Sequence, residues 1–158
     1  MLSKKKNIGY LIYKLKNMKN LIATTLFLFL GIGLISGQEI ETLDLTIEVS
    51  ITKYNKGTVM LALYNSSDTY MKKTHKAAKQ EVVDNKAIFT FKNIQKGSYA
   101  FSMFHDVNDN RKMDKNFMGI PKEPYAFSNN KKGKFGPPDF EKVQFEVNEN
   151  LTLQVSIK

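Results

Sequence analysis

Apolar and polar side chains alternate without a fault between Leu43 and Thr52. Every odd-numbered position, from Leu43 to Ile51, is apolar, and every even-numbered position is polar. Successive side chains of an extended strand point to opposite faces, so this period of two collects all the apolar groups on one face. In a helix the same groups would be spread around the axis. The segment is therefore predicted to be a strand with one face buried.

Five further segments have the alternation or the apolar run of a buried strand. They are Thr58–Tyr64, Lys86–Lys92, Ser98–Phe104, Lys142–Val147 and Leu151–Ile157. Because Ser98–Phe104 carries large apolar groups on both faces, it is predicted to be a central strand. The turns at residues 55–57 and 148–150 predict two hairpins, one at each end of the domain. Residues 66–80 are predicted to be an irregular crossover with a short helical stretch.

These strands predict an all-β fold for residues 38–158, namely an antiparallel two-sheet β-sandwich of about seven strands, immunoglobulin-like or prealbumin-like. A single domain suits the length of this segment, and a hydrophobic content of 42% is enough for a core. The chain contains no Cys, which excludes disulfide scaffolds, thiolate catalysis and cysteine-ligated metal sites.

Residues 1–37 have the organisation of a secretory signal peptide. Six lysines precede the apolar run Leu21–Ser36, and residues 1–37 contain no acidic residue. The apolar run is shorter than the ~20 apolar residues that a membrane-spanning helix needs. We expect cleavage near Gly37 and export of residues 38–158 to the periplasm or the cell exterior. An uncleaved N-terminal anchor is the alternative. Met18 begins a segment that is a complete signal peptide by itself, so translation from Met18 is an alternative to translation from Met1.

The net charge of +9 belongs mostly to the predicted signal peptide. The six lysines of residues 1–37 leave +3 for residues 38–158, which is only mildly cationic. The lysine clusters of the mature segment contain no nucleic-acid-binding motif. We therefore expect no nucleic-acid partner, and contact with a membrane only through the signal segment if it is not cleaved.

The long polar segment 105–139 contains the pattern of a calcium loop. Oxygen-bearing side chains stand at relative positions 1, 3, 5 and 9 of the segment that begins at Asp106, and the position 7 residue offers a backbone carbonyl. Arg111 stands at position 6, where glycine is usual, and Phe117 at position 12, where glutamate is usual. Glu123 is the nearest acid that can fold back as the last ligand. The predicted Ca²⁺ ligands are Asp106, Asn108, Asn110, Lys112, Asp114 and Glu123. The alternative is a metal-free loop in which Asn and Asp form turns.

A ligand site is predicted at Tyr125, Asn129 and Asn130, because an aromatic face beside amide groups suits a sugar or a peptide. The alternative for the neighbouring phenylalanines, Phe127, Phe135 and Phe140, is that they pin the loop to the sandwich. A hydrolytic triad of His105, Ser128 and a carboxylate, Asp106 or Asp139, lacks any local signature of an activated serine. We therefore expect no enzymatic activity.

Five elements of the sequence carry a resemblance to a known family. They are the Gly-x-Tyr-Ala strand at residues 97–100, the His-Asp-x-Asn-x-Asn loop at 105–110, Gly-Ile-Pro-x-Glu at 119–123, Phe-Ser-Asn-Asn at 127–130 and Gly-Pro-Pro-x-Phe at 136–140. With them, residues 43–158 closely resemble the bacterial exported family known as domain of unknown function 2141. The chain departs from that family at Arg111 and Ala126, where glycines are common. The resemblance implies an exported bacterial protein and leaves its activity open.

Taken together, these features predict an exported, non-catalytic binding or accessory module of the bacterial cell envelope, with a Ca²⁺-stabilised loop at residues 106–114. Its expected partner is an envelope glycan or protein. Two alternatives remain at this point: a purely structural or interaction domain without metal, and a hydrolase that uses His105.

Overall fold

The computed structural model describes residues 13–14, 41–133 and 136–158. The predicted signal peptide, residues 1–37, and its cleavage site lie outside these residues, apart from Tyr13 and Lys14. Residues Ile40–Lys158 form a unit with its own set of internal contacts. Within the described ranges, no helix is both long and apolar enough to cross a bilayer.

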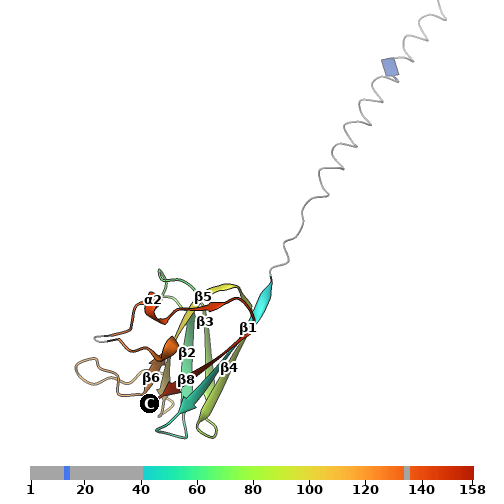
Figure 1. The fold of residues 1–158 in the computed structure, drawn as a ribbon. Coiled ribbons are helices and arrows are strands. Elements are labelled where there is room, and N and C mark those ends of the chain that lie inside the picture. Colours follow the sequence, from blue (N-terminus) through green and yellow to red (C-terminus); the bar gives the residue numbers. More distant parts are fainter. Residues whose placement is uncertain (1–12, 15–40, 134–135) are drawn as a thin grey trace, which may run out of the picture. The chain divides into compact units, whose positions relative to one another are not determined.

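Two β-sheets pack face to face, so the predicted all-β sandwich is confirmed (Figure 1). The first sheet has the strand order β4–β1–β8, formed by Lys86–Gln95, Thr42–Ile51 and Leu151–Ile157. The second has the order β3–β2–β5–β6, formed by Lys76–Glu81, Thr58–Tyr64, Gly97–Asp106 and Tyr125–Phe127. The strand β7, Phe145–Val147, pairs with another part of β5.

The core lies between the sheets and is built from the alternating positions of the strands. The five odd-numbered residues of β1, from Leu43 to Ile51, are at most 8% exposed, as the alternation predicts. They meet buried side chains of β2, β4, β5 and β8, which all belong to one continuous cluster. β5 lies between β2 on one side and β6 and β7 on the other, so the predicted central position of this strand is confirmed.

The two predicted hairpins are wrong. β1 and β2 follow one another in the chain but belong to different sheets. β7 and β8 also separate: β7 pairs with β5, whereas β8 runs parallel to β1 over the register from Leu45–Leu151 to Ile51–Ile157. A sandwich must bury the apolar face of each strand against the opposite sheet, and this requirement overrides pairing between sequence neighbours.

Three local predictions also need correction. The first part of the predicted strand Lys142–Val147 is a short helix, α2 (Phe140–Val143), and only β7 is extended. The predicted crossover 66–80 ends in the strand β3, and Tyr125–Phe127 forms the short strand β6. β3 is mostly exposed and lies at the edge of its sheet, so its sequence lacks the apolar alternation of an interior strand.

A second, smaller apolar cluster covers the outer face of the second sheet. Its buried residues are Tyr64, Ala100, Phe127, Phe140 and Val143. The predicted pinning role of Phe127 and Phe140 is thereby confirmed, whereas Phe135 lies outside the described residues. The ring of Tyr70 packs edge-on against Tyr64 and Phe140, with centroids 5.1 and 5.7 Å away. Burial, together with the nearby Tyr64 and Asp139, raises the pKa of Tyr70 to about 12.

Candidate functional site

Asp106, the last residue of β5, organises the loop that leads from β5 to β6. Its carboxylate is buried and accepts two backbone hydrogen bonds across the first turn of the loop. The amide of Asn110 donates to Oδ1 at 3.1 Å, and the amide of Arg111 donates to Oδ2 at 2.7 Å. A buried carboxylate is stable when charge-assisted bonds of this kind replace its lost hydration. Asp106 therefore folds residues 107–111 around itself.

Arg111 takes the backbone conformation for which glycine is usually selected. Its φ is +64°, and Asp109, two residues earlier, has a φ of +55°. A side chain in the left-handed region costs roughly 1 kcal/mol relative to glycine. The loop thus turns sharply at Arg111, the position at which calcium loops usually have glycine.

Glu123 returns to this loop from the far end of the connection, as its position in the sequence predicts. Its side chain is only 7% exposed. Oε1 accepts the amide of Val107 at 3.0 Å, and Oε2 accepts the amide of Asp114 at 3.1 Å. The amide of Lys122 also donates to the carbonyl of Asp114 at 2.8 Å. One carboxylate therefore joins the first and last turns of the loop.

The two asparagines complete a cluster of oxygen-bearing side chains. Asn108 and Asn110 donate through Nδ2 to the two carboxylate oxygens of Asp114, at 2.9 and 3.0 Å. Their Oδ1 atoms accept the backbone amides of Asn110 and Lys112, at 3.3 and 2.8 Å. These are the turn-forming bonds that the metal-free alternative predicts.

The described part of the chain brings no three His, Asp or Glu side chains close enough together to hold a metal by themselves. Metal binding at this loop thus depends on the amide oxygens of Asn108 and Asn110 and on the Lys112 carbonyl, in addition to the carboxylates. A hard cation such as Ca²⁺ accepts this mixed oxygen set, and occupancy requires the two amide groups to turn Oδ1 inward.

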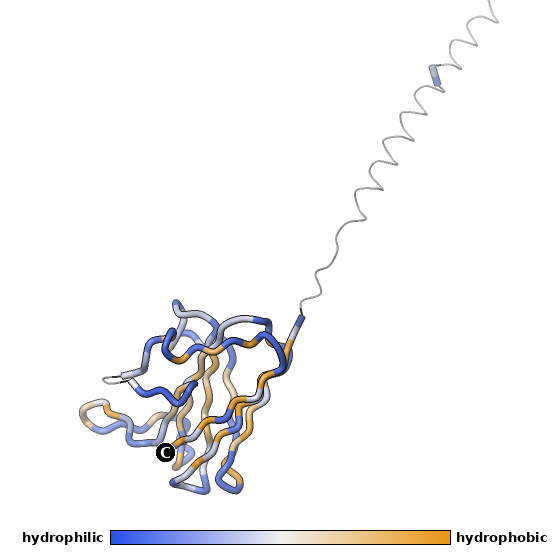
Figure 2. Tube along the Cα trace, in the orientation of Figure 1, coloured by the Kyte–Doolittle hydropathy of each residue, from blue (hydrophilic) through white to orange (hydrophobic). Residues whose placement is uncertain are grey.

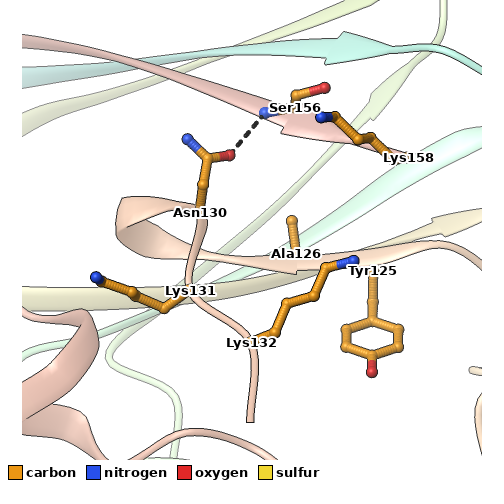
Figure 3. A pocket seen from close by; sticks show the side chains of 7 residues that line it. All are labelled: Tyr125, Ala126, Asn130, Lys131, Lys132, Ser156 and Lys158. Carbon is orange, nitrogen blue, oxygen red and sulfur yellow. Dashed lines mark hydrogen bonds between the residues drawn. The ribbon is translucent and has the colours of Figure 1, made fainter.

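A cavity of about 420 Å³ lies where β6, the 3₁₀ turn η1 (Ser128–Asn130) and the end of β8 meet (Figure 3). Its lining residues are Tyr125, Ala126, Asn130, Lys131, Lys132, Ser156 and Lys158. Asn130 bridges two elements here, because its Oδ1 accepts the backbone amide of Ser156 at 3.1 Å. Tyr125 is partly exposed and packs edge-on against Phe127 at 5.9 Å.

The structure thus brings two of the three predicted ligand residues, Tyr125 and Asn130, to one cavity. Asn129 does not line it: its Nδ2 donates to the carbonyl of Gln144 at 2.9 Å and ties η1 to the end of α2. The other charged lining residues, Lys131, Lys132 and Lys158, are not among the ligand residues predicted from the sequence. Because Lys158 lies far along the chain from Lys131 and Lys132, no sequence pattern indicates that the three residues line one cavity.

His105 and Ser128 make separate contacts with the backbone. The ring of His105 is fully buried, and its Nε2 lies 2.6 Å from the carbonyl of Lys56. The hydroxyl of Ser128 is also buried and accepts the amide of Phe101 at 3.0 Å. Each side chain therefore holds backbone in place: His105 holds the turn before β2, and Ser128 holds η1 against β5.

A family model described as "Uncharacterized protein conserved in bacteria (DUF2141)" matches residues 47–154, which is well over half of the chain. The match covers the 106–114 loop, most of both sheets and the cavity residues except Ser156 and Lys158, which follow it. Comparisons with curated proteins and with solved structures gave no match.

Proposed function

The chain belongs to this bacterial family of uncharacterized proteins, and we propose that it is an exported, non-catalytic module of the cell envelope that binds an acidic glycan. The observation that carries this proposal is the cavity beside β6 and β8, whose lining includes three lysines and the partly exposed Tyr125. Support for export comes from the basic and apolar segments of residues 1–37.

The lining of the cavity suits a sugar that carries carboxylate or phosphate groups. A partly exposed tyrosine offers a flat apolar face on which a pyranose ring can stack. Lys131, Lys132 and Lys158 give the rim three positive charges, and no acidic side chain lines the cavity. Opposite charges of ligand and rim favour encounter and select against neutral sugars.

A non-catalytic role is supported by the positions of the groups that hydrolysis would need. His105 and Ser128 are buried in separate backbone contacts, and neither lines the cavity. A general base must lie within hydrogen-bond reach of the proton that it removes. Binding therefore accounts for the arrangement of the cavity better than hydrolysis with His105 does.

We expect residues 38–158 to bind an oligogalacturonate of defined length and to bind its fully methyl-esterified, neutral form at least about tenfold more weakly, because the lysines lose their partners. Tyr125→Ala and the pair Lys132→Ala, Lys158→Ala should each weaken binding of the acidic form about tenfold. Isothermal titration calorimetry measures all four affinities.

The matched control is the pair Lys72→Ala, Lys73→Ala, which removes the same charge from an exposed segment outside the cavity. If this pair weakens binding as much as the cavity pair, the attraction is a general charge effect and the proposed site is wrong. Equal affinity for the acidic and the neutral oligomer would also contradict it. No binding of either oligomer would favour the alternative of a structural or interaction domain.

We further propose that the 106–114 loop binds Ca²⁺. The supporting observation is that two buried carboxylates hold the backbone of this loop: Glu123 accepts the amides of Val107 and Asp114, and Asp106 accepts the amide of Arg111. The left-handed Arg111 gives the loop the turn that such a site requires. Lys112 and Arg111 offset part of the acidic charge, so we expect modest affinity.

A site with a dissociation constant of about 0.1 mM should stabilise residues 38–158 by ~1.4 kcal/mol at about 1 mM Ca²⁺, which corresponds to a rise of roughly 5 °C in the melting temperature. Differential scanning calorimetry with Ca²⁺ and with chelator measures this rise. The rise should vanish in Asp114→Ala and persist in Asp68→Ala, a matched change far from the loop. An unchanged melting temperature in the wild type would contradict Ca²⁺ binding.

A further inference from the structure

The outer end of the β5–β6 connection exposes three large apolar side chains next to one another. Phe117 is 97% exposed, Met118 is 68% exposed and Ile120 is 54% exposed. Figure 2 shows the hydrophobic end of this loop projecting from the sandwich between hydrophilic flanks. Single exposed apolar residues are ordinary on protein surfaces, whereas a contiguous group of them marks a surface that meets a partner or a membrane.

The end of the loop is a structured turn that holds these side chains outward. The Oδ1 atom of Asn116 accepts the amides of Met118 and Ile120 at 2.9 and 3.0 Å. The backbone of Asn116 also exchanges bonds with Ile120 and Gly119, at 2.9 and 3.0 Å. Because the turn is already formed, little further ordering is needed when its side chains enter an apolar phase.

Positive charges flank this apolar turn. Arg111, Lys112, Lys115 and Lys122 are all exposed, and the one acid between them, Asp114, is engaged by two asparagine amides. Over residues 41–133 and 136–158, the ion pairs that the structure shows are Lys96–Glu41 and Lys142–Asp139. The four cations of the loop are therefore available to an external anion.

We propose that the turn 116–120 inserts into the surface of an anionic phospholipid bilayer. A projecting apolar end can enter the boundary between headgroups and acyl chains, while lysines a few residues away reach the lipid phosphates. The surface of such a bilayer supplies both the apolar phase and the negative charge that the loop lacks. This contact does not involve the cavity at Tyr125. It is a second membrane contact, in addition to the one that the sequence predicts for residues 1–37 if they are not cleaved.

The chain contains no Trp, so a single introduced tryptophan reports on the turn without background. We expect the fluorescence of Phe117→Trp in residues 38–158 to shift to shorter wavelength when phosphatidylglycerol-containing vesicles are added, because the indole leaves water. Pure phosphatidylcholine vesicles should give a much smaller shift. Ile88→Trp is the matched control, since Ile88 is 52% exposed on β4, outside the turn. Its emission should stay constant.

Co-sedimentation with the same vesicles separates insertion from charge attraction. Phe117→Ser with Met118→Ser should weaken vesicle binding at least about tenfold, while Ile88→Ser leaves it unchanged. Lys115→Gln with Lys122→Gln should weaken binding and reduce its dependence on salt. These side chains make no core contacts, so the melting temperatures of the variants should match that of the wild type.

Three results would overturn the proposal: no binding of the wild type to anionic vesicles at low salt, wild-type binding by the Phe117→Ser, Met118→Ser variant, or an equal wavelength shift at Ile88→Trp. The first result would indicate that the turn meets a protein partner instead. None of these results bears on the glycan proposal, whose variants lie in the cavity.

Discussion

Replacing Glu123 with alanine should lower the free energy of unfolding of residues 38–158 by about 2–4 kcal/mol. The Glu123 carboxylate is buried and accepts the amides of Val107 and Asp114, one at each end of the loop. Alanine leaves both donors, which lie at partly buried positions, without their acceptor, and each unsatisfied group carries a desolvation penalty. Urea unfolding in the presence of chelator measures the loss without any contribution from Ca²⁺.

Two further variants sharpen this test. Glu123→Gln keeps the shape of the side chain but places an NH₂ group against one backbone donor, so we expect a loss smaller than that of alanine. Glu149→Ala, in the exposed turn before β8, removes a carboxylate that makes no hydrogen bond within the described residues, and it should change stability by less than about 0.5 kcal/mol. Equal effects of Glu123→Ala and Glu149→Ala would show that Glu123 does not hold the loop.

Gly57→Ala should destabilise the domain by about 3 kcal/mol or more. Gly57 precedes β2 and has a φ of +85°. A Cβ atom there would lie 2.3 Å from the carbonyl oxygen of Asp106 and 3.0 Å from the Cα of Val107. Both neighbours are backbone atoms at the start of the 106–114 loop, so no side-chain rotation relieves the collision. Thermal and urea unfolding of the purified variant measure the effect.

Gly119→Ala is the control that separates collision from backbone strain. Gly119 has a φ of +80°, close to that of Gly57, but a Cβ atom there would meet nothing within 4 Å. The control should therefore show only the strain of the left-handed conformation, roughly 1 kcal/mol. If the two alanine variants are equally stable, the close approach of residue 57 to the end of β5 plays no part in stability.

Much of the candidate loop could be predicted from the sequence because its contacts are local. Asp106 bonds to amides four and five residues ahead, and the asparagines bond within six residues, so the spacing of oxygen groups already describes the turn. The return of Glu123 was also predictable, because one acid stands where the loop must close. The positive φ of Arg111 was not predictable. Arginine by itself prefers a negative φ, and the hydrogen bond from its amide to Asp106 holds it in the positive region.

The cavity was only half predictable. Tyr125 and Asn130 are close in sequence, so the sequence predicts that an aromatic ring and an amide group share one site. Lys158 joins them only because β8 lies at the open edge of the first sheet, beside η1, where Asn130 bonds to Ser156. No local pattern encodes that contact.

The sequence by itself determined the strands whose apolar side chains alternate, β1 above all, and the face that each of them buries, because this alternation has the same period as the backbone of an extended chain. It also indicated the turn-forming loop, whose bonds span few residues. Only the tertiary structure decided which strands pair. The turn after β1 leads to the opposite sheet, and β8 lies parallel to β1 instead of against β7. Strands that are distant in sequence pair in the arrangement that buries the apolar faces of all the strands together. The sequence of any one strand therefore does not specify its partner.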